Sequence, residues 1–263
     1  WDSPWGAGRP GWHIECSAMG QKYLGDTFDI HGGGKDLVFP HHENEIAQSC
    51  GVTGCLPVRF WVHNGFVNID KEKMSKSLGN FFTLRDIFKK FHPEALRLFL
   101  ISSHYRSPID FSMKNLEDAE KVILRFYEAL DNAESIVGDH NISLDEIKNH
   151  PFLAKCEKAM NDDFNTAVVV AHLNEESRGI NSECSLIGNG EGDKKNLALR
   201  LSTFRFVGEL LGLLTGSPEK IRQEIFNIKK TELELDVGKI ECLIYDRNEA
   251  RKNKNWDRAD ECR

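Results

Sequence analysis

The feature that most constrains the fold is a change in hydrophobic periodicity near residue 90. Beyond this point apolar residues recur every three to four positions, which is the spacing of one helix face. One such run begins near Pro93, and proline is favoured at a helix start. Further runs cover residues 112–136, 152–160, 164–180, 196–215, 218–230 and 239–252. This part of the chain predicts a helical bundle, with a glycine-rich, charged loop at residues 187–195.

Before residue 90 the apolar runs are short and are separated by glycines, as in strands. Phe28–Ile30 is followed by Gly32–Gly34, so we expect a strand that ends in a tight loop. Phe60–Val62 and Gly65–Ile69 also have the composition of strands. Strands that alternate with brief helices form α/β layers. The predicted fold class is therefore α/β followed by all-α.

The length, the charge and the cysteine usage limit the classes of protein to which this chain can belong. A chain of 263 residues is long enough for two domains. Its formal charge of −7 argues against nonspecific nucleic-acid binding but allows a local basic patch. No run approaches the roughly 20 apolar residues that span a bilayer, so no membrane association is expected. The seven cysteines are irregularly spaced, which predicts a reducing, cytoplasmic location. We interpret the pair Cys50 and Cys55 as structural.

Cys16, His41 and Glu45 form a candidate metal site. His41 and Glu45 are four residues apart just after Pro40, so one helix face could present both side chains. A thiolate, an imidazole and a carboxylate together suit Zn²⁺. Spacing alone also allows a capping or packing role for His41, a solvated Glu45 and a small core residue at Cys16. Three ligands leave a fourth position for substrate, water or another residue.

The segment Lys73–Ser77 reads Lys-Met-Ser-Lys-Ser and is followed by Gly79 after one leucine. Lys73 and Lys76 flank a serine in a loop that could bring two ammonium groups onto a polyphosphate. Positive charge placed against a transition state is among the larger contributions to catalysis. A solvated basic turn is the alternative reading of the composition, although the ordered string argues against it.

These motifs resemble the class I aminoacyl-tRNA synthetases, and in particular their cysteine-specific branch. The lysine-serine segment matches the KMSKS signature of the class. Similarity to the cysteine-specific branch is carried by Pro10–Ser17, Asp29–Gly34 and Phe39–Glu45. The resemblance is nearly continuous over residues 1–112 and looser through Asn161–Thr166 and residues 247–263.

The resemblance implies a role for each matching residue. Cys16, His41 and Glu45 fall on three of the family's four zinc ligands, and the fourth is expected from a segment upstream of Trp1. In the family this zinc binds the thiolate of the substrate cysteine. The residues that would bind the substrate are Trp12, His13, His31 and Asp36. The residues implied for ATP are Gly32, Gly33, Asp36 and Lys76, with Lys76 and Lys73 as the catalytic lysines.

The implied architecture is the second half of a Rossmann-like catalytic domain followed by a helical tRNA-binding bundle. We expect the catalytic part at residues 1–83, a stem-contact segment at 84–115 and the bundle at 116–263. The family's HIGH motif would lie upstream, so residues 1–263 alone are expected to be inactive in adenylation.

The implied reaction is ATP-dependent activation of L-cysteine, with Mg²⁺ accompanying ATP, and transfer of cysteine to the 3′ end of its tRNA. A monomer is expected. Two alternatives remain open. One is the related ligase that joins cysteine to a glucosaminyl-inositol acceptor in mycothiol synthesis. The other is a noncatalytic RNA-binding paralogue.

Overall fold

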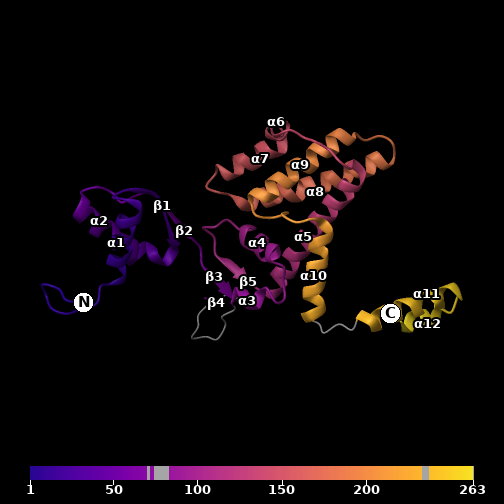
Figure 1. The fold of residues 1–263 in the computed structure, drawn as a ribbon, viewed down its shortest axis with the longest axis horizontal. Helices are drawn as coiled ribbons and strands as arrows, with labels where there is room; N and C mark the ends of the chain where they lie inside the picture. Colours follow the sequence, from indigo (N-terminus) through magenta and orange to yellow (C-terminus); the bar gives the residue numbers. More distant parts are fainter. Residues whose placement is uncertain (70–71, 74–82, 233–236, 263) are drawn as a thin grey trace. The chain divides into compact units, whose positions relative to one another are not determined.

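The computed structural model describes residues 1–69, 72–73, 83–232 and 237–262 (Figure 1). The chain divides into two compact units. Unit 1 comprises Trp1–Asn80, Ile101–Ser112 and Met160–Ala167, and unit 2 comprises Phe81–Leu100, Met113–Ala159 and Val168–Arg263. The α/β layer followed by helices is confirmed. The three expected domain ranges stay a prediction, because the units interleave along the sequence.

In unit 1, two parallel strands and two helices form an α/β layer. The order is α1 (Trp12–Leu24), β1 (Phe28–Gly34), α2 (Glu43–Thr53) and β2 (Val58–Asn64). Strands β1 and β2 pair in parallel with His31 opposite Trp61. Helices α1 and α2 pack against each other. Parallel pairing requires a crossover between the strands, and α2 lies within that connection.

The connection from β1 to α2 differs from the expectation. Gly32–Gly34 lie within β1 and not in a loop, because their backbone pairs with β2. A 3-10 turn at Lys35–Leu37 and a π-type turn at Val38–His42 follow, and α2 begins only at Glu43. His41 therefore lies in the turn before α2. The helical path still brings its side chain to Glu45.

A second, three-stranded sheet in unit 1 has β3 (Val67–Ile69) at its centre. β4 (Glu72–Lys73) pairs with it antiparallel, and β5 (Ile109–Phe111) pairs with it in parallel. Gly65 lies just before β3, where a side chain would not fit: an added Cβ would be 2.3 Å from the backbone oxygen of Ser107. Glycine at position 65 therefore permits the close approach of the two segments.

Unit 2 is built mainly from helices. They are α3 (Leu84–Ile87), α4 (Pro93–Ile101), α5 (Met113–Val137), α6 (Leu144–Lys148), α7 (Pro151–Met160), α8 (Thr166–Gly188), α9 (Lys194–Leu210), α10 (Pro218–Glu232), α11 (Val237–Lys252) and α12 (Trp256–Glu261). The predicted helices are confirmed, and α8 runs eight residues further than expected, to Gly188. Helix α5 packs on α9 and α10, with Phe126 edge-on to Phe204 at 5.5 Å in the core.

A buried carboxylate joins three segments of unit 2. Glu94 on α4 accepts hydrogen bonds from the hydroxyl of Tyr127 at 2.9 Å and from the backbone N–H of Leu214 at 3.0 Å. The hydroxyl of Thr215 also donates to it, at 3.1 Å. Leu214 is fully buried with a φ of 58°, so the carboxylate stabilises an unfavourable backbone conformation.

Among the described residues, no helix is both long and apolar enough to cross a membrane.

Candidate metal centre

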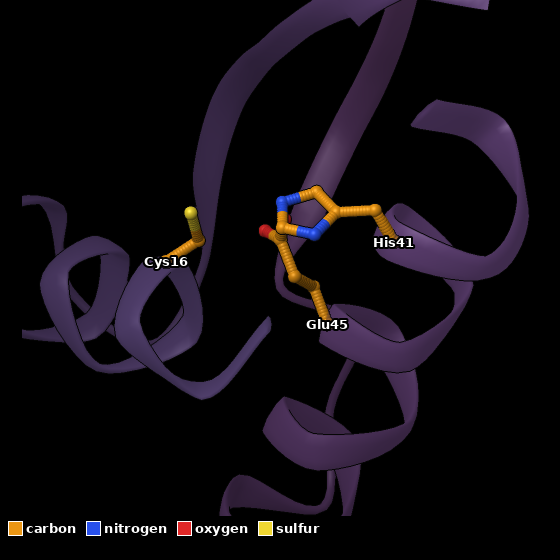
Figure 2. A group of neighbouring side chains, drawn as sticks. All are labelled: Cys16, His41 and Glu45. Carbon is orange, nitrogen blue, oxygen red and sulfur yellow. The ribbon is translucent and has the colours of Figure 1, made fainter. Parts of the chain in front are cut away.

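Three potential metal ligands, one each from α1, from the turn before α2 and from α2, point into one space (Figure 2). Cys16 lies on the second turn of α1, and His41 and Glu45 lie on the turn that leads into α2 and on α2 itself. Their ligand atoms all lie within 4.8 Å of one another. The packing of α1 against α2 thus brings together residues that are 25 positions apart or more in the sequence.

Glu45 is held in an environment that favours a metal ion. The residue is only 4% exposed, and its Oε1 atom lies 2.6 Å from Nε2 of His41. Despite this short distance, Oε1 has no partner in hydrogen-bond geometry among the described residues. A buried carboxylate oxygen without a hydrogen bond is costly. Burial raises the pKa of Glu45 to about 7. A cation between the three side chains would satisfy this oxygen.

The other two donors also suit a metal. Burial, followed by the charge of Glu45, raises the pKa of the Cys16 thiol. Burial, followed by the charge of His13, lowers the pKa of His41, so the imidazole stays neutral and keeps a lone pair. A soft sulfur, an imidazole nitrogen and a carboxylate oxygen make a donor set that fits Zn²⁺. Binding of the ion would displace the thiol proton.

His13 and Trp12 support His41 from the start of α1. Nδ1 of His13 lies 2.6 Å from Nδ1 of His41. If Nε2 of His41 binds a metal, its Nδ1 carries the proton and donates to His13, which fixes the tautomer and the orientation of the ring. The ring of Trp12 lies 4.3 Å from the ring of His41, and Trp12 is 59% exposed. Trp12 therefore offers an open apolar surface beside the candidate ligands.

A second wall of the site combines histidines with a tryptophan that the sequence analysis did not single out. The ring of Trp61 lies 4.8 Å from those of both His31 and His42. His42 and His63 share a hydrogen bond of 2.8 Å. His31 lies opposite Trp61 in the parallel register, so strand pairing was the signal that could have identified this tryptophan.

The wall formed by His31, His42 and Trp61 lies beside Glu45, one of the candidate ligands. His31, His42 and Glu45 form a second group of potential ligand atoms within 4.8 Å of one another. Nε2 of His31 lies 3.7 Å from Oε2 of Glu45, the oxygen that does not face His41. Cys16, His31, Glu45 and Trp61 help to line a small cavity of about 100 Å³.

The residues expected at ATP lie at the carboxyl end of β1 or beyond the described residues. An added Cβ at Gly33 would be 2.7 Å from the His42 ring. Packing against His42 therefore favours glycine at position 33, in addition to the role predicted for Gly33 at ATP. Gly32 is exposed, and Asp36 lies in the turn after β1 with its carboxylate over Gly34. Ligands of parallel sheets bind at this end of the strands. Lys73 ends β4, and Lys76 lies outside the described residues.

The comparisons with protein families and solved structures agree with this architecture. Residues 1–121 match a model described as the class I (C) tRNA synthetase catalytic domain, and residues 155–215 match the DALR domain. In structure the chain resembles a leucyl-tRNA synthetase from Agrobacterium radiobacter (TM-score 0.52, 17% identity, 72% of this chain and 28% of that one). It also resembles a putative arginyl-tRNA synthetase from Campylobacter jejuni (TM-score 0.51, 14% identity, 80% and 52%). At these identities the likeness concerns the fold alone.

Curated relatives are much closer in sequence. A cysteine–tRNA ligase of Pelobacter propionicus is 47% identical over 280 residues, and one of Geobacter sulfurreducens is 49% identical over 269. Each alignment covers 100% of this chain and 56% or 55% of the relative, so the chain spans about half their length. Since this identity extends over the whole chain and the catalytic and DALR models follow in order, the chain belongs to the cysteine-specific family of class I tRNA synthetases.

Proposed function

We propose that the chain is the zinc-binding and helical part of a cysteine–tRNA ligase, which activates L-cysteine with ATP and transfers it to tRNA. The observation that carries the proposal is the convergence of Cys16, His41 and Glu45 beside the open face of Trp12. Relatives named cysteine–tRNA ligase support the same activity. The sulfur-containing donor set suits a site that must distinguish a thiol from a hydroxyl.

In this proposal Cys16, His41 and Glu45 hold one Zn²⁺. The bound ion supplies a soft electrophilic partner for the thiolate of the substrate, which the hydroxyl of serine cannot match. His13 keeps the His41 ring oriented through the bond between their Nδ1 atoms. Trp12 provides an apolar wall, and His31 and Asp36 bind the polar end of the amino acid. Pocket contacts alone separate near-isosteres by only about 1–3 kcal/mol.

The chain's other proposed roles concern ATP and tRNA. Gly32 and Gly33 let the nucleotide approach the end of β1, and Lys76, assisted by Lys73, neutralises the phosphates of ATP with Mg²⁺. The cysteine carboxylate then attacks the α-phosphate, which forms cysteinyl-adenylate and releases pyrophosphate. A ribose hydroxyl at the tRNA 3′ end takes the cysteinyl group, and AMP leaves. Charge stabilisation and positioning carry both steps. Residues 84–115 and the helical bundle at 116–263 contact the tRNA.

The test is charging of total tRNA with labelled cysteine by the complete gene product, with labelled serine as the control. We expect tRNA-dependent incorporation of cysteine and none of serine. Cysteine-dependent ATP turnover without charging would instead support the mycothiol-type ligase. No turnover at all would contradict both enzymes and favour a noncatalytic paralogue.

A further inference from the structure

The turn between α7 and α8 has an unusual backbone. Asp163 and its neighbour Phe164 both have a φ of 54°, in the left-handed region that favours glycine. Two consecutive residues in this region are unfavourable for L-amino acids, so surrounding contacts must maintain the conformation. Although α7 and α8 belong largely to unit 2, this turn falls within unit 1.

The contacts that maintain the turn come from residues 104–107. The Asp163 carboxylate accepts hydrogen bonds from the hydroxyl of Tyr105 at 2.7 Å and from Nε and Nη2 of Arg106 at 2.5 and 3.2 Å. Both carboxylate oxygens are engaged, so the Arg106 contact is bidentate. These bonds, that of Arg106 first, lower the pKa of Asp163. The carboxylate is therefore ionised and paired at neutral pH.

The same residues contact the strand that leads toward the lysine-serine segment. The backbone oxygen of Tyr105 accepts from the N–H of Gly65 at 2.7 Å, and Phe66 accepts from Ile109 at 2.8 Å. The approach is so close that only glycine fits at position 65 against Ser107. Beyond these contacts β3 pairs in parallel with β5.

Strand β4 is held in place by its antiparallel pairing with β3. Asn68 is paired with Lys73 and Ile69 with Glu72. Lys73 is the last residue of β4 and the first of the segment Lys73–Ser77. A continuous set of hydrogen bonds thus connects the Asp163 turn, through residues 104–107 and β3, with the strand from which that segment starts.

We infer that Asp163 and Arg106 are positioning residues for the adenylation step: their ion pair fixes the 104–107 turn and, through β3 and β4, the start of the lysine-serine segment. The inference rests on the proposed function. Small displacements of a catalytic group cost rate more than binding, because the reacting geometry is lost while the substrate contacts persist. The pair therefore contributes to kcat and leaves the cysteine site intact.

The experiment measures cysteine-dependent ATP–pyrophosphate exchange, without tRNA, in the complete gene product. Asp163→Asn removes the charge at nearly constant shape, and Arg106→Lys keeps the charge but loses the bidentate geometry. The matched control is Asp131→Asn, because Asp131 forms a comparable exposed pair with Arg222 at 2.8 Å within unit 2. Zinc content and melting temperature are recorded for every variant.

We expect kcat for exchange to fall about tenfold in both Asp163→Asn and Arg106→Lys. The KM values for cysteine and ATP should stay within about twofold, and Asp131→Asn should match the wild type. An active wild type with unchanged kcat in both variants would overturn this inference alone. Equal losses in the Asp131→Asn control, or a lowered melting temperature that accounts for the loss, would also overturn it. A wild type without exchange would overturn the proposed function and this inference with it.

Discussion

At the scale of single residues, the candidate centre depends on one carboxylate oxygen. Oε1 of Glu45 is buried, lies 2.6 Å from His41 and has no hydrogen bond among the described residues. A protein rarely leaves such an atom unsatisfied. Cys16 is the only sulfur donor in the two ligand groups that the described residues form. Its thiolate is the part of the donor set that favours zinc over magnesium or calcium.

Replacement of this sulfur gives the first prediction. Cys16→Ser should weaken zinc binding by more than about 100-fold, since even substitutions behind a ligand cost 10–100-fold. The measurement is competition with a chelator, with the zinc content read by mass spectrometry. Cys50→Ser is the control, because Cys50 lies half-buried on α2 and belongs to neither group of candidate ligands. Retention of stoichiometric, tight zinc in Cys16→Ser would contradict the assignment.

At the scale of elements, Glu94 ties α4 to α5 and to the loop after α9. In that loop the backbone N–H groups of Leu214 and Thr215 both donate to the Glu94 carboxylate, at 3.0 and 3.3 Å. The hydroxyl of Tyr127 donates to the same carboxylate and accepts from Gly216. Burial, followed by the charge of Glu94, raises the pKa of Tyr127. The phenol therefore remains a donor throughout the physiological range.

Removal of this carboxylate gives the second prediction. Glu94→Ala leaves buried donors without an acceptor, at a cost of about 1–3 kcal/mol for each unsatisfied group. The amides of residues 211–217 should then exchange hydrogen about 10–100-fold faster by mass spectrometry. Glu128→Ala removes an exposed carboxylate from α5 and should change stability by less than about 0.5 kcal/mol. Unchanged exchange in Glu94→Ala would show that the network does not stabilise the loop.

At the scale of the whole molecule, the two units have different cores. Within the described part of unit 1, the buried apolar side chains are Pro57, Val58, Ile69 and Phe111, and its buried polar ones are His41, His42 and Glu45. Unit 2 contains a long apolar core that includes Leu116, Ile123, Phe126, Leu130, Leu173, Leu197 and Phe204. Small cores usually need an additional stabilising device such as a metal.

Metal removal should therefore affect the two units unequally. With a chelator, amides in α1 and α2 should exchange at least about tenfold faster, because the proposed ion would join these two helices. The amides of α5 and α9 should keep their protection, since apolar packing stabilises them. Hydrogen exchange of the complete gene product with and without chelator measures both at once. Equal loss of protection in α5 and α9 would contradict a local role of the metal.

Sequence reasoning succeeded where a pattern repeats and was incomplete where tertiary contacts decide. The 3.6-residue periodicity identified α5 and α10, because a long apolar stripe has few other structures available. The run of three glycines suggested a loop at Gly32–Gly34, although pairing with β2 extends β1 through these residues. Spacing and donor chemistry suggested Cys16, His41 and Glu45 as a metal site, and the motif resemblance implied zinc; their roles remain predictions. The position of Trp61 beside His31 depends on the register of β1 and β2. The Asp163–Arg106 ion pair joins residues that are 57 positions apart, so no local pattern indicates it.

The parallel pairing of β3 with β5 also sets an order of events during synthesis. Val67 leaves the ribosome well before its partner Ile109, so β3 at first has only the short β4 beside it. Two strands alone are marginally stable in water. At roughly 5–20 residues per second, the wait lasts seconds, and the open edge of β3 is a template for mispairing during that time. The strand that leads into the lysine-serine segment thus acquires its final place only after a later part of the chain has been translated.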